Sequence, residues 1–380
     1  GRDYLIPKPV DQRVLLRVAP AVAKAAMDSG VAKKSIDLNK YQESIERLLG
    51  PTRRIIRKLR KAITANKKQK PKILLTSGSH EKVMKAAMQV AQDGEVNLVL
   101  MGKKSLIHQK MKELNIPTSE RISILDASLI EDLSPYAKRL YDLRKRKGVS
   151  RTMAKEMVKR DLSLASLMLE MGEVDGMISG IDLSYKESLL PVLEVIKPIA
   201  EQKLTGVYMM VKDQKPLFFS DCTVNISPTA EELAAIAITT AEIAARYTKD
   251  PIRIAMLSFA SFGVSKHEKS RKVSKAVEIV KAQAPHLEID GEMQVDVALN
   301  KTLRNEEFPF CALSDDANVL IFPDLASANI GYKLLTNLGG LTPTGPILAG
   351  LSKPAHIVQR GATVQEVISM IYIAAHQTLL

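Results

Sequence analysis

The sequence has 380 residues, of which 46% are hydrophobic and 26% charged, and its formal net charge is +13. This length exceeds the roughly 250–300 residues at which one hydrophobic core usually stops growing, so we expect two domains. Because no uncharged apolar run reaches about 18 residues and no basic start precedes a hydrophobic stretch, we expect a cytoplasmic protein without a membrane-spanning helix or a secretory signal.

The cysteines and histidines do not indicate a metal centre. Cys222 and Cys311 are the two cysteines, too few and too far apart for a disulfide framework or a zinc cluster. The six histidines form neither HxxxH nor HExxH spacings. We therefore expect no metal site in this sequence.

Helical periodicity dominates the first 66 residues. Apolar residues at helical spacing predict a helix over about 14–26, with Pro20 either kinking it or marking its start. Residues 39–66 are also predicted to be helical, with a break at Gly50-Pro51. The basic, unpatterned tract at 66–71 is predicted to be a linker.

Much of the positive charge lies in the second of these helical regions and the linker after it. Ten Lys and Arg residues fall between Arg53 and Lys72. Such a run can be a solvated helix face and linker, or it can bind nucleic acid or a small polyanion. The stretch has no aromatic residue to stack on bases and the whole sequence has no Trp, which favours the solvated face and argues against nucleic acid.

After Pro71, short apolar runs alternate with amphipathic helices, which indicates a mostly parallel sheet with helices on its faces. The predicted strands are Lys72–Thr76, Val96–Met101, Arg121–Leu125, Gly176–Ser179, Gly206–Lys212, Leu217–Ser220, Ile252–Ser258 and Asn318–Phe322. The later predicted helices are Ala230–Tyr247, Lys269–Gln283, Ser327–Leu338 and Val364–Thr378. Asp213-Gln214 separates two strands and predicts a hairpin, so some pairing should be antiparallel.

Four segments of this region resemble phosphotransacetylases. They are DCTVNISPTAE at 221–231, DGEMQVDVALN at 290–300, NVLIFPDLASANIGYK at 318–333 and GPILAGLSKP at 345–354. The resemblance covers roughly residues 70–380, in order. It implies a two-domain α/β fold with mostly parallel sheets flanked by helices and a cleft between the domains. It assigns 71–190 plus 349–380 to domain I and 191–348 to domain II.

The N-terminal segments RDYLIPKP at 2–9 and APAVA at 19–23 are similar to the end of a malic enzyme catalytic domain. Hybrid, multidomain NADP-dependent malic enzymes join such a domain to a phosphotransacetylase-like half. The resemblance therefore makes residues 1–30 a malic enzyme tail and 31–70 a basic helical linker. It places NADP and a divalent metal in a malic enzyme half outside this sequence. It also implies homo-oligomers that pair through domain II and grow larger in the full-length enzyme.

The resemblance also shows changes at the reacting positions. Acetyl transfer between phosphate and coenzyme A needs a carboxylate base, cations for the phosphoryl group and a donor for the developing oxyanion. Gln359 stands where the family carries a reactive serine, and Leu190 where it carries an arginine. Glu366 replaces an aspartate, and it also fits the N3 position of a capping box that starts at Thr363. We therefore predict no transferase activity at a useful rate.

Binding is a separate question, because the loops around these positions keep their small and polar residues. The residues implied to contact acetyl-CoA are Ser184, Tyr185, Ser261, Gly263, Lys266, Asn329, Tyr332, Lys333, Gly345, Gln359, Arg360 and Gly361. Asn329, Tyr332 and Lys333 are expected at the start of a helix, where backbone N–H groups favour anions. Plainer interpretations remain open: Asn329 as a turn residue, and the two lysines as solvated surface groups. Cys222 is predicted to be a buried small hydrophobe.

Three hypotheses for function follow. In the first, the domain binds acetyl-CoA or CoA in a degenerate cleft, inhibits a malic enzyme that converts malate to pyruvate, and promotes oligomerisation. In the second, it is an active phosphate acetyltransferase that makes acetyl phosphate from acetyl-CoA and phosphate. In the third, it is a ligand-free oligomerisation scaffold.

Overall fold

The computed structural model describes residues 12–48, 51–66, 69–200, 202–212 and 215–379. Its first sheet has five parallel strands in the order β11-β4-β1-β2-β3. These strands are β1 (Lys72–Leu75), β2 (Asn97–Met101), β3 (Ile122–Leu125), β4 (Gly176–Ser179) and β11 (Ala355–Ile357). The last strand in the chain thus completes the first sheet, beside β4.

The second sheet has six strands in the order β10-β5-β6-β9-β7-β8. They are β5 (Thr205–Lys212), β6 (Lys215–Ser220), β7 (Arg253–Leu257), β8 (Glu288–Met293), β9 (Val319–Ile321) and β10 (Pro343–Ala349). The β10–β5 and β5–β6 pairs are antiparallel, and the other pairs are parallel. The predicted antiparallel pairing is confirmed, although the turn at Asp213-Gln214 lies outside the described residues.

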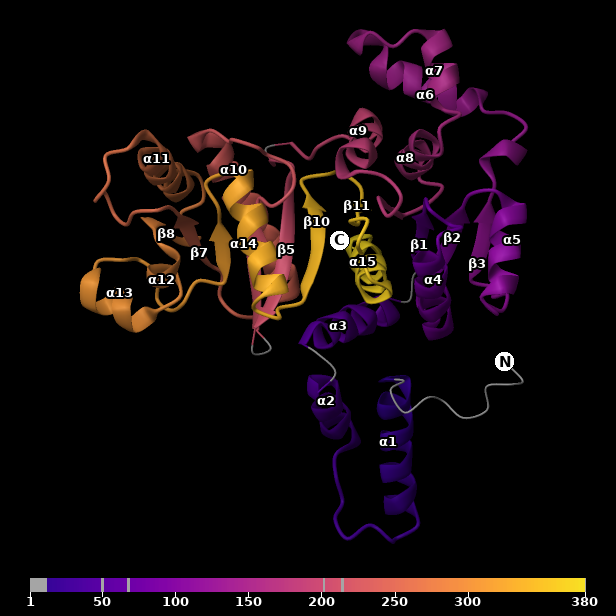
Figure 1. Cartoon of the computed structure of the whole chain (residues 1–380), viewed down its shortest axis with the longest axis horizontal. Coiled ribbons are helices and arrows are strands. Elements are labelled where there is room, and N and C mark those ends of the chain that lie inside the picture. The colour runs from indigo at the N-terminus through magenta and orange to yellow at the C-terminus, as the bar shows by residue number, and fades with distance from the viewer. Residues whose placement is uncertain (1–11, 49–50, 67–68, 201, 213–214, 380) are drawn as a thin grey trace.

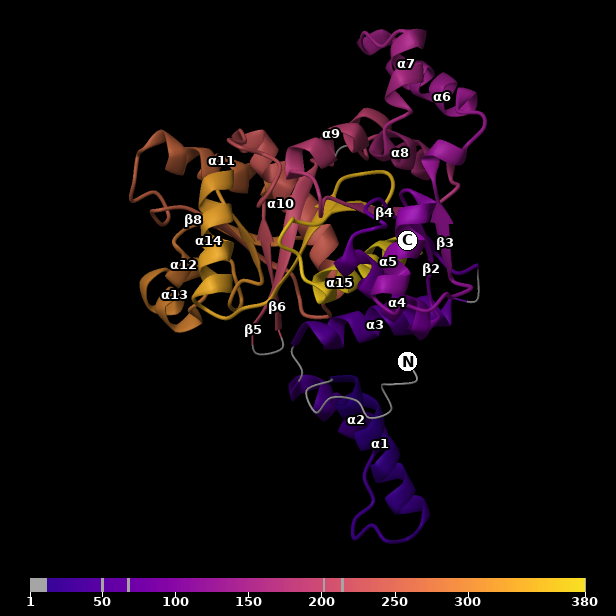
Figure 2. The same cartoon turned by 45° about the vertical axis from the view of Figure 1, so that its right-hand side comes forward.

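Helices cover both sheets (Figures 1 and 2). The helices are α1 (Gln12–Asp28), α2 (Leu38–Leu48), α3 (Pro51–Ala65), α4 (Glu81–Asp93), α5 (Lys104–Glu113), α6 (Ser134–Arg144), α7 (Arg151–Met157), α8 (Asp161–Met171), α9 (Tyr185–Val195), α10 (Ala230–Tyr247), α11 (Glu268–Gln283), α12 (Val295–Ala298), α13 (Lys301–Glu307), α14 (Leu325–Asn337) and α15 (Val364–Gln377). Short 3₁₀ turns are η1 (Ala127–Leu129) and η2 (Lys145–Lys147). Pro20 lies inside α1, so the suggestion that it marks the helix start is wrong.

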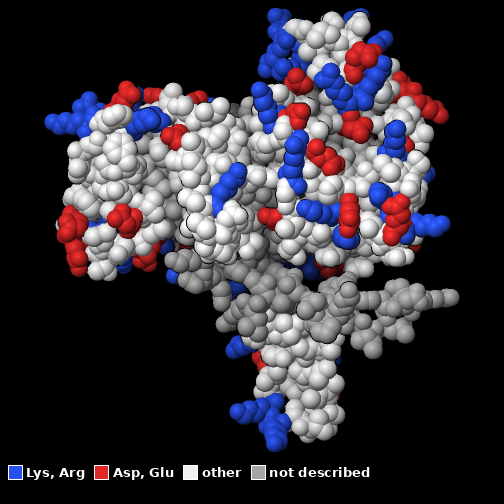
Figure 3. Space-filling model, in the orientation of Figure 1, with Lys and Arg blue, Asp and Glu red and all other residues white. Residues whose placement is uncertain are grey.

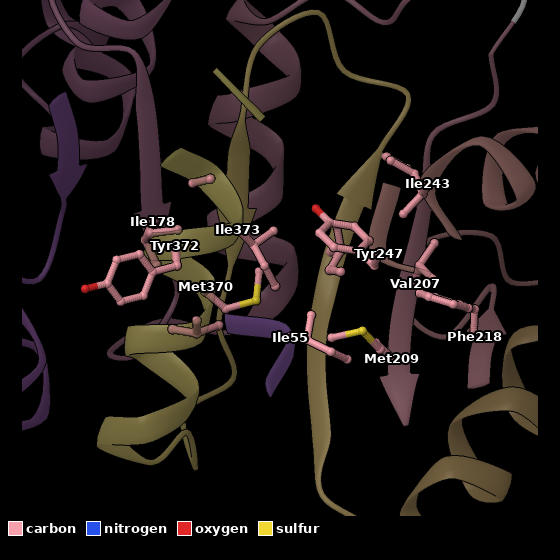
Figure 4. Close-up of a cluster of buried hydrophobic side chains, with 14 of the residues drawn as sticks. Ile55, Ile178, Val207, Met209, Phe218, Ile243, Tyr247, Met370, Tyr372 and Ile373 are labelled. Carbon is pink, nitrogen blue, oxygen red and sulfur yellow. The ribbon is translucent and has the colours of Figure 1, made fainter. Parts of the chain in front are cut away.

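The last helix, α15, joins the two halves of the molecule. It lies between the sheets in Figure 1 and contacts β1 and β4 of the first and β10 of the second. Its residues 367–375 are all buried, which suits a helix covered on every side. Figure 4 shows Met370 and Ile373 of this helix close to Ile178 of β4, with Met209 of β5 across the same core. Burying each such side chain contributes about 1.5–3 kcal/mol.

Candidate functional site

The loop after β6 is built around the Asp221 carboxylate. Asp221 is buried, and its Oδ1 accepts from the backbone N–H groups of Gly206 (2.9 Å), Thr223 (2.9 Å) and Val224 (3.2 Å). Its Oδ2 accepts from the backbone and the side-chain amide of Asn225. A carboxylate with this many donors is fully satisfied, so Asp221 holds the loop in shape rather than offering a free base.

Gln359 follows β11 and reaches two tyrosines on the second-sheet half. Its Nε2 donates to the hydroxyl oxygens of Tyr208 (3.0 Å) and Tyr332 (3.1 Å). The two rings stack with centroids 4.3 Å apart and an interplanar angle of 22°. Burial raises the pKa of both Tyr208 and Tyr332, so both hydroxyls stay neutral near pH 7. Gln359, which the family resemblance aligned with a serine, therefore belongs to a neutral hydrogen-bonding cluster.

Tyr185 makes a second contact between the halves. It is the first residue of α9, and its hydroxyl lies 3.0 Å from Thr223 Oγ1 in the loop held by Asp221. Burial raises the pKa of Tyr185 as well.

Gly345 allows β10 to pass close to Tyr208. A Cβ at this position would lie 2.8 Å from the Val207 carbonyl oxygen, and the φ of Gly345 is +145°.

At the two other positions that the resemblance marked as changed, the structure shows a helix-capping glutamate and an exposed leucine. Glu366 forms the predicted capping box: its Oε2 accepts from Thr363 N at 2.6 Å, and its own N–H donates to Thr363 Oγ1. Leu190 lies on α9 with 51% of its surface exposed.

Arg360 is exposed, and its Nη2 lies 4.0 Å from Glu187 Oε2. Glu187 in turn caps α9 together with Ser184. An exposed pair of this kind contributes little to stability.

The expectation that Asn329, Tyr332 and Lys333 lie at the start of a helix is wrong. Helix α14 begins at Leu325, and Asp324 occupies its N-cap, accepting from Ser327 N at 2.8 Å. The three residues therefore lie in later turns, where backbone N–H groups bond within the helix. Asn329 instead donates from its side chain to the Cys222 carbonyl oxygen at 3.4 Å.

Ser261, Gly263 and Lys266 form a separate group after β7. Glu292 holds this loop, accepting from Gly263 N at 2.7 Å, while Ser261 Oγ accepts from Gln294 N at 3.1 Å. Lys266 is exposed, as are Lys333 and Gly361 elsewhere. Among the described residues, no hydrogen bond joins this loop to Gln359 or its tyrosines. The structure thus divides the predicted site residues into two groups.

Sequence reasoning missed Tyr208 and Thr223. Tyr208 lies in β5 between buried Val207 and Met209, so the apolar pattern presents it as a core residue. A signal did exist for Thr223, because it lies three residues after the end of β6, within the DCTVN segment. Cys222 is buried as predicted, and burial raises the pKa of its thiol, so it is not poised as a nucleophile.

One cavity lies away from this cluster. It has a volume of about 690 Å³ and is lined by residues of the N-terminal helices, α4 and α15, among them Arg17, Arg60, Gln89 and Tyr372. None of the predicted acetyl-CoA contacts lines it. In the described part of the chain, no helix is long and apolar enough to cross a membrane, and no three His, Cys, Asp or Glu side chains gather as metal ligands.

Comparison with known proteins now gives the family. The profile of one family, phosphate acetyl/butaryl transferase, matches residues 55–375. The chain belongs to the phosphate acetyl/butaryl transferase family. A phosphate acetyltransferase from Clostridium acetobutylicum is 36% identical over 82% of this chain and 95% of its own length. The crystal structure of a phosphotransacetylase from Streptococcus pyogenes is 32% identical, covers 86% of this chain and 98% of its own, and superposes with a TM-score of 0.80.

This member of the phosphate acetyl/butaryl transferase family also matches longer proteins. The NADP-dependent malic enzyme of Haemophilus influenzae is 37% identical over 99% of this chain and 50% of its own length. The chain spans about half the length of the malic enzymes it matches and corresponds to their C-terminal half. The fold expected from the sequence, an α/β protein with mostly parallel sheets flanked by helices, is confirmed.

Proposed function

We propose that this domain binds acetyl-CoA where the two sheets meet, without transferring its acetyl group, and so inhibits a malic enzyme half in a longer protein. The observation that carries the proposal is the bond from Gln359 to Tyr208 and Tyr332 at the family's serine position. The 37% identity to a malic enzyme of twice the length supports the regulatory setting. In that setting, NADP and a divalent metal act in the malic enzyme half.

The chemistry of the cluster favours binding over transfer. An amide and two neutral hydroxyls can donate to and accept from the carbonyl and amide groups of a pantetheine thioester, at about 0.5–1.5 kcal/mol for each bond. None of them takes a proton from a thiol near pH 7. Glu366 is committed to its cap, and Leu190 has no charge to hold a phosphoryl oxygen. The site therefore keeps hydrogen-bonding partners for the ligand and lacks those for the reaction.

Calorimetry and an acetyl phosphate assay on the same protein test this proposal. We expect acetyl-CoA to bind, and we expect no acetyl phosphate to form from acetyl-CoA and phosphate. Gln359→Ser should remain inactive because Leu190 still leaves the phosphate unheld, while Tyr332→Phe should weaken acetyl-CoA binding roughly fivefold through one lost hydrogen bond. The Clostridium acetobutylicum phosphate acetyltransferase serves as the positive control for the assay.

The same assay decides the second candidate, an active phosphate acetyltransferase. The 36% identity to such an enzyme over nearly its full length favours that candidate. Sustained turnover by the wild-type domain would establish it and remove the sensor-only interpretation. Absence of both turnover and binding heat at millimolar acetyl-CoA would leave the oligomerisation scaffold.

We also infer pairing with a second copy through α14. This helix turns Tyr332 toward Gln359 and exposes an apolar row on another face: Ile330 (59% exposed), Leu334 (52%) and Leu338 (83%). The spacing of four residues puts the row on one side of the helix. An exposed apolar row of this kind favours a contact with another protein surface. One helix would then carry both a ligand contact and the pairing face.

Leu334→Glu is therefore expected to convert the protein to monomers, because a desolvated carboxylate would lie in the interface. Sedimentation velocity at matched concentration measures the mass. Leu129→Glu is the control, since Leu129 is 65% exposed in η1, outside α14. A Leu334→Glu protein with the wild-type mass would rule out this interface.

The exposed apolar face of helix α1 supports the proposal that this domain lies next to a malic enzyme half. It stands away from the two sheets in Figures 1 and 2 and exposes Leu15, Val18 and Val22. We infer that residues 1–30 form the end of that half, and that this apolar face packs against it. The predicted linker of residues 31–70 ends earlier than expected, because α3 buries Ile55, Leu59 and Ile63 in the core that it shares with α15, and the family profile already matches from residue 55.

A further inference from the structure

A helical projection above the first sheet carries a dense cluster of positive charge. Residues 134–160, comprising α6, η2 and α7, contain ten Lys and Arg residues against Asp142 and Glu156, a net charge of +8 out of +13 for the whole sequence. We name this segment the basic knob. Figure 1 shows α6 and α7 projecting beyond the sheet, and Figure 3 shows Lys and Arg gathered over them. The chain thus has a second positively charged segment besides residues 53–72. The proposed function assigns no role to this second segment.

The basic knob is an ordered part of the fold. Its apolar side chains Ala137, Leu140, Val149, Ala154 and Val158 are buried and belong to the core cluster of the first sheet. The turn between its helices is set by a left-handed glycine at 148 and by an N-cap serine at 150. The positive charges are therefore displayed on a fixed scaffold.

Most of these charges have no carboxylate partner among the described residues. Arg139 pairs with Glu170, Lys145 with Asp142 at 3.1 Å, and Lys159 with Glu156 at 2.7 Å. The remaining exposed cations make no such pair in the described structure: Lys138, Arg146, Lys147, Arg151, Lys155 and Arg160. Holding like charges close together costs electrostatic free energy. A negatively charged surface bound to the basic knob would reduce this cost.

The partner favoured by these features is a protein surface rather than nucleic acid. The ring of Tyr141 is covered by Arg151 and Lys145, whose charged groups lie 5.4 Å and 5.9 Å from its centroid. The Tyr136 hydroxyl is bound to Glu173. Neither tyrosine offers an open face on which a base could stack.

An acidic surface of the needed kind exists on the same chain. Residues 295–316 hold five exposed carboxylates, and the basic residues among them are Lys301 and the buried Arg304. We name this surface the acidic tip; its carboxylates are Asp296, Glu306, Glu307, Asp315 and Asp316. Figures 1 and 2 place α13 of the tip and α7 of the knob at opposite ends of the molecule. Figure 3 shows red residues over α13.

We propose that the basic knob of one copy docks on the acidic tip of a second copy. Because the two patches lie on different parts of the chain, the contact is head-to-tail and builds rings or open rows, unlike the two-fold pairing inferred for α14. The contact is held by exposed charges, so it is weak and salt-sensitive. It does not depend on ligand binding or on the α14 interface.

A charge-swap experiment tests the proposal. The wild-type association constant, measured by sedimentation velocity, should fall at least about tenfold between about 50 mM and about 500 mM NaCl. At low salt, the double variants Arg146→Glu/Lys147→Glu and Glu306→Lys/Glu307→Lys should each lose this salt-dependent association. An equimolar mixture of the two should regain it, since an acidic knob then meets a basic tip. All four positions are exposed, and thermal melts show whether each variant is folded.

Three results would overturn the proposal: wild-type association that does not change with salt, either variant associating like the wild type, or a mixture that fails to recover association. A fluorescent 20-nucleotide RNA probes the alternative partner. Loss of RNA binding in the knob variant with self-association unchanged would assign the knob to nucleic acid instead.

Discussion

Asp221→Ala is expected to lower the free energy of unfolding by about 4 kcal/mol, the largest effect of any single change considered, because it leaves several buried donors without an acceptor. The carboxylate accepts from Gly206 on β5 and from Thr223, Val224 and Asn225 in its own loop. Alanine offers none of these acceptors. Urea unfolding followed by circular dichroism measures the loss.

The same change should remove acetyl-CoA binding under the proposed function, because Thr223 then no longer holds Tyr185. Asp250→Ala is the matched control, since Asp250 is exposed and is expected to be neutral within about 0.5 kcal/mol. An Asp221→Ala protein as stable as this control would show that water replaces the carboxylate in the loop.

Acid is expected to destabilise the protein through His356, by about 2 kcal/mol at pH 5 relative to pH 7. His356 is buried on β11; its Nδ1 accepts from Leu348 N at 3.2 Å, so the proton sits on Nε2, 2.8 Å from Gln377 Oε1. Burial lowers the pKa of His356 from 6.5 to about 4. The unfolded chain therefore takes up a proton first as the pH falls. The stability that His356 contributes is complete above pH 6.5 and is lost progressively toward pH 4.

The contribution of His356 is isolated by comparison with His356→Gln, whose side chain can still accept from Leu348 N but does not titrate. Urea unfolding midpoints at pH 7, 6 and 5 should fall more steeply for the wild type than for this variant. The control His286→Gln changes an exposed histidine and should keep the wild-type slope. Equal slopes for all three proteins would mean that groups other than His356 set the acid sensitivity.

The sequence predicted most of the elements whose pattern is local. Helix α10 was expected at Ala230–Tyr247 and lies there, because the capping box at Thr229 marks its start and a long apolar periodicity follows. Strands β8, β10 and β11 were not among the predicted strands. β8 carries Glu288, Asp290 and Glu292, which is an unusual composition for a buried strand. The carboxylates of Asp290 and Glu292 are stabilised by hydrogen bonds from Lys281 and from the backbone N–H of Gly263, which the local sequence pattern does not show. β10 contains two prolines and a glycine, which read locally as a turn.

The sequence predicted which segments lie near the candidate site, but it did not predict which side chains contact one another there. Family resemblance brought Gln359 and Tyr332 to the same site, and the structure joins them. It could not provide Tyr208, because a tyrosine within a buried strand gives no sign of which groups its hydroxyl meets. The resemblance also could not show that Lys266 lies in a different group from Gln359. The order of motifs along the chain gives no distances between their residues in space.

The way the chain returns to its first sheet has a consequence for synthesis. β11, beside β4, begins at Ala355, 176 positions after Ser179 at the end of β4. At about 5–20 residues per second, the ribosome needs roughly 10–35 s to supply that strand. β10, which completes the second sheet, comes only a few residues earlier. Each sheet thus keeps an open strand edge until residues 343–357 have been made, and this interval is when the nascent chain most needs protection from its neighbours.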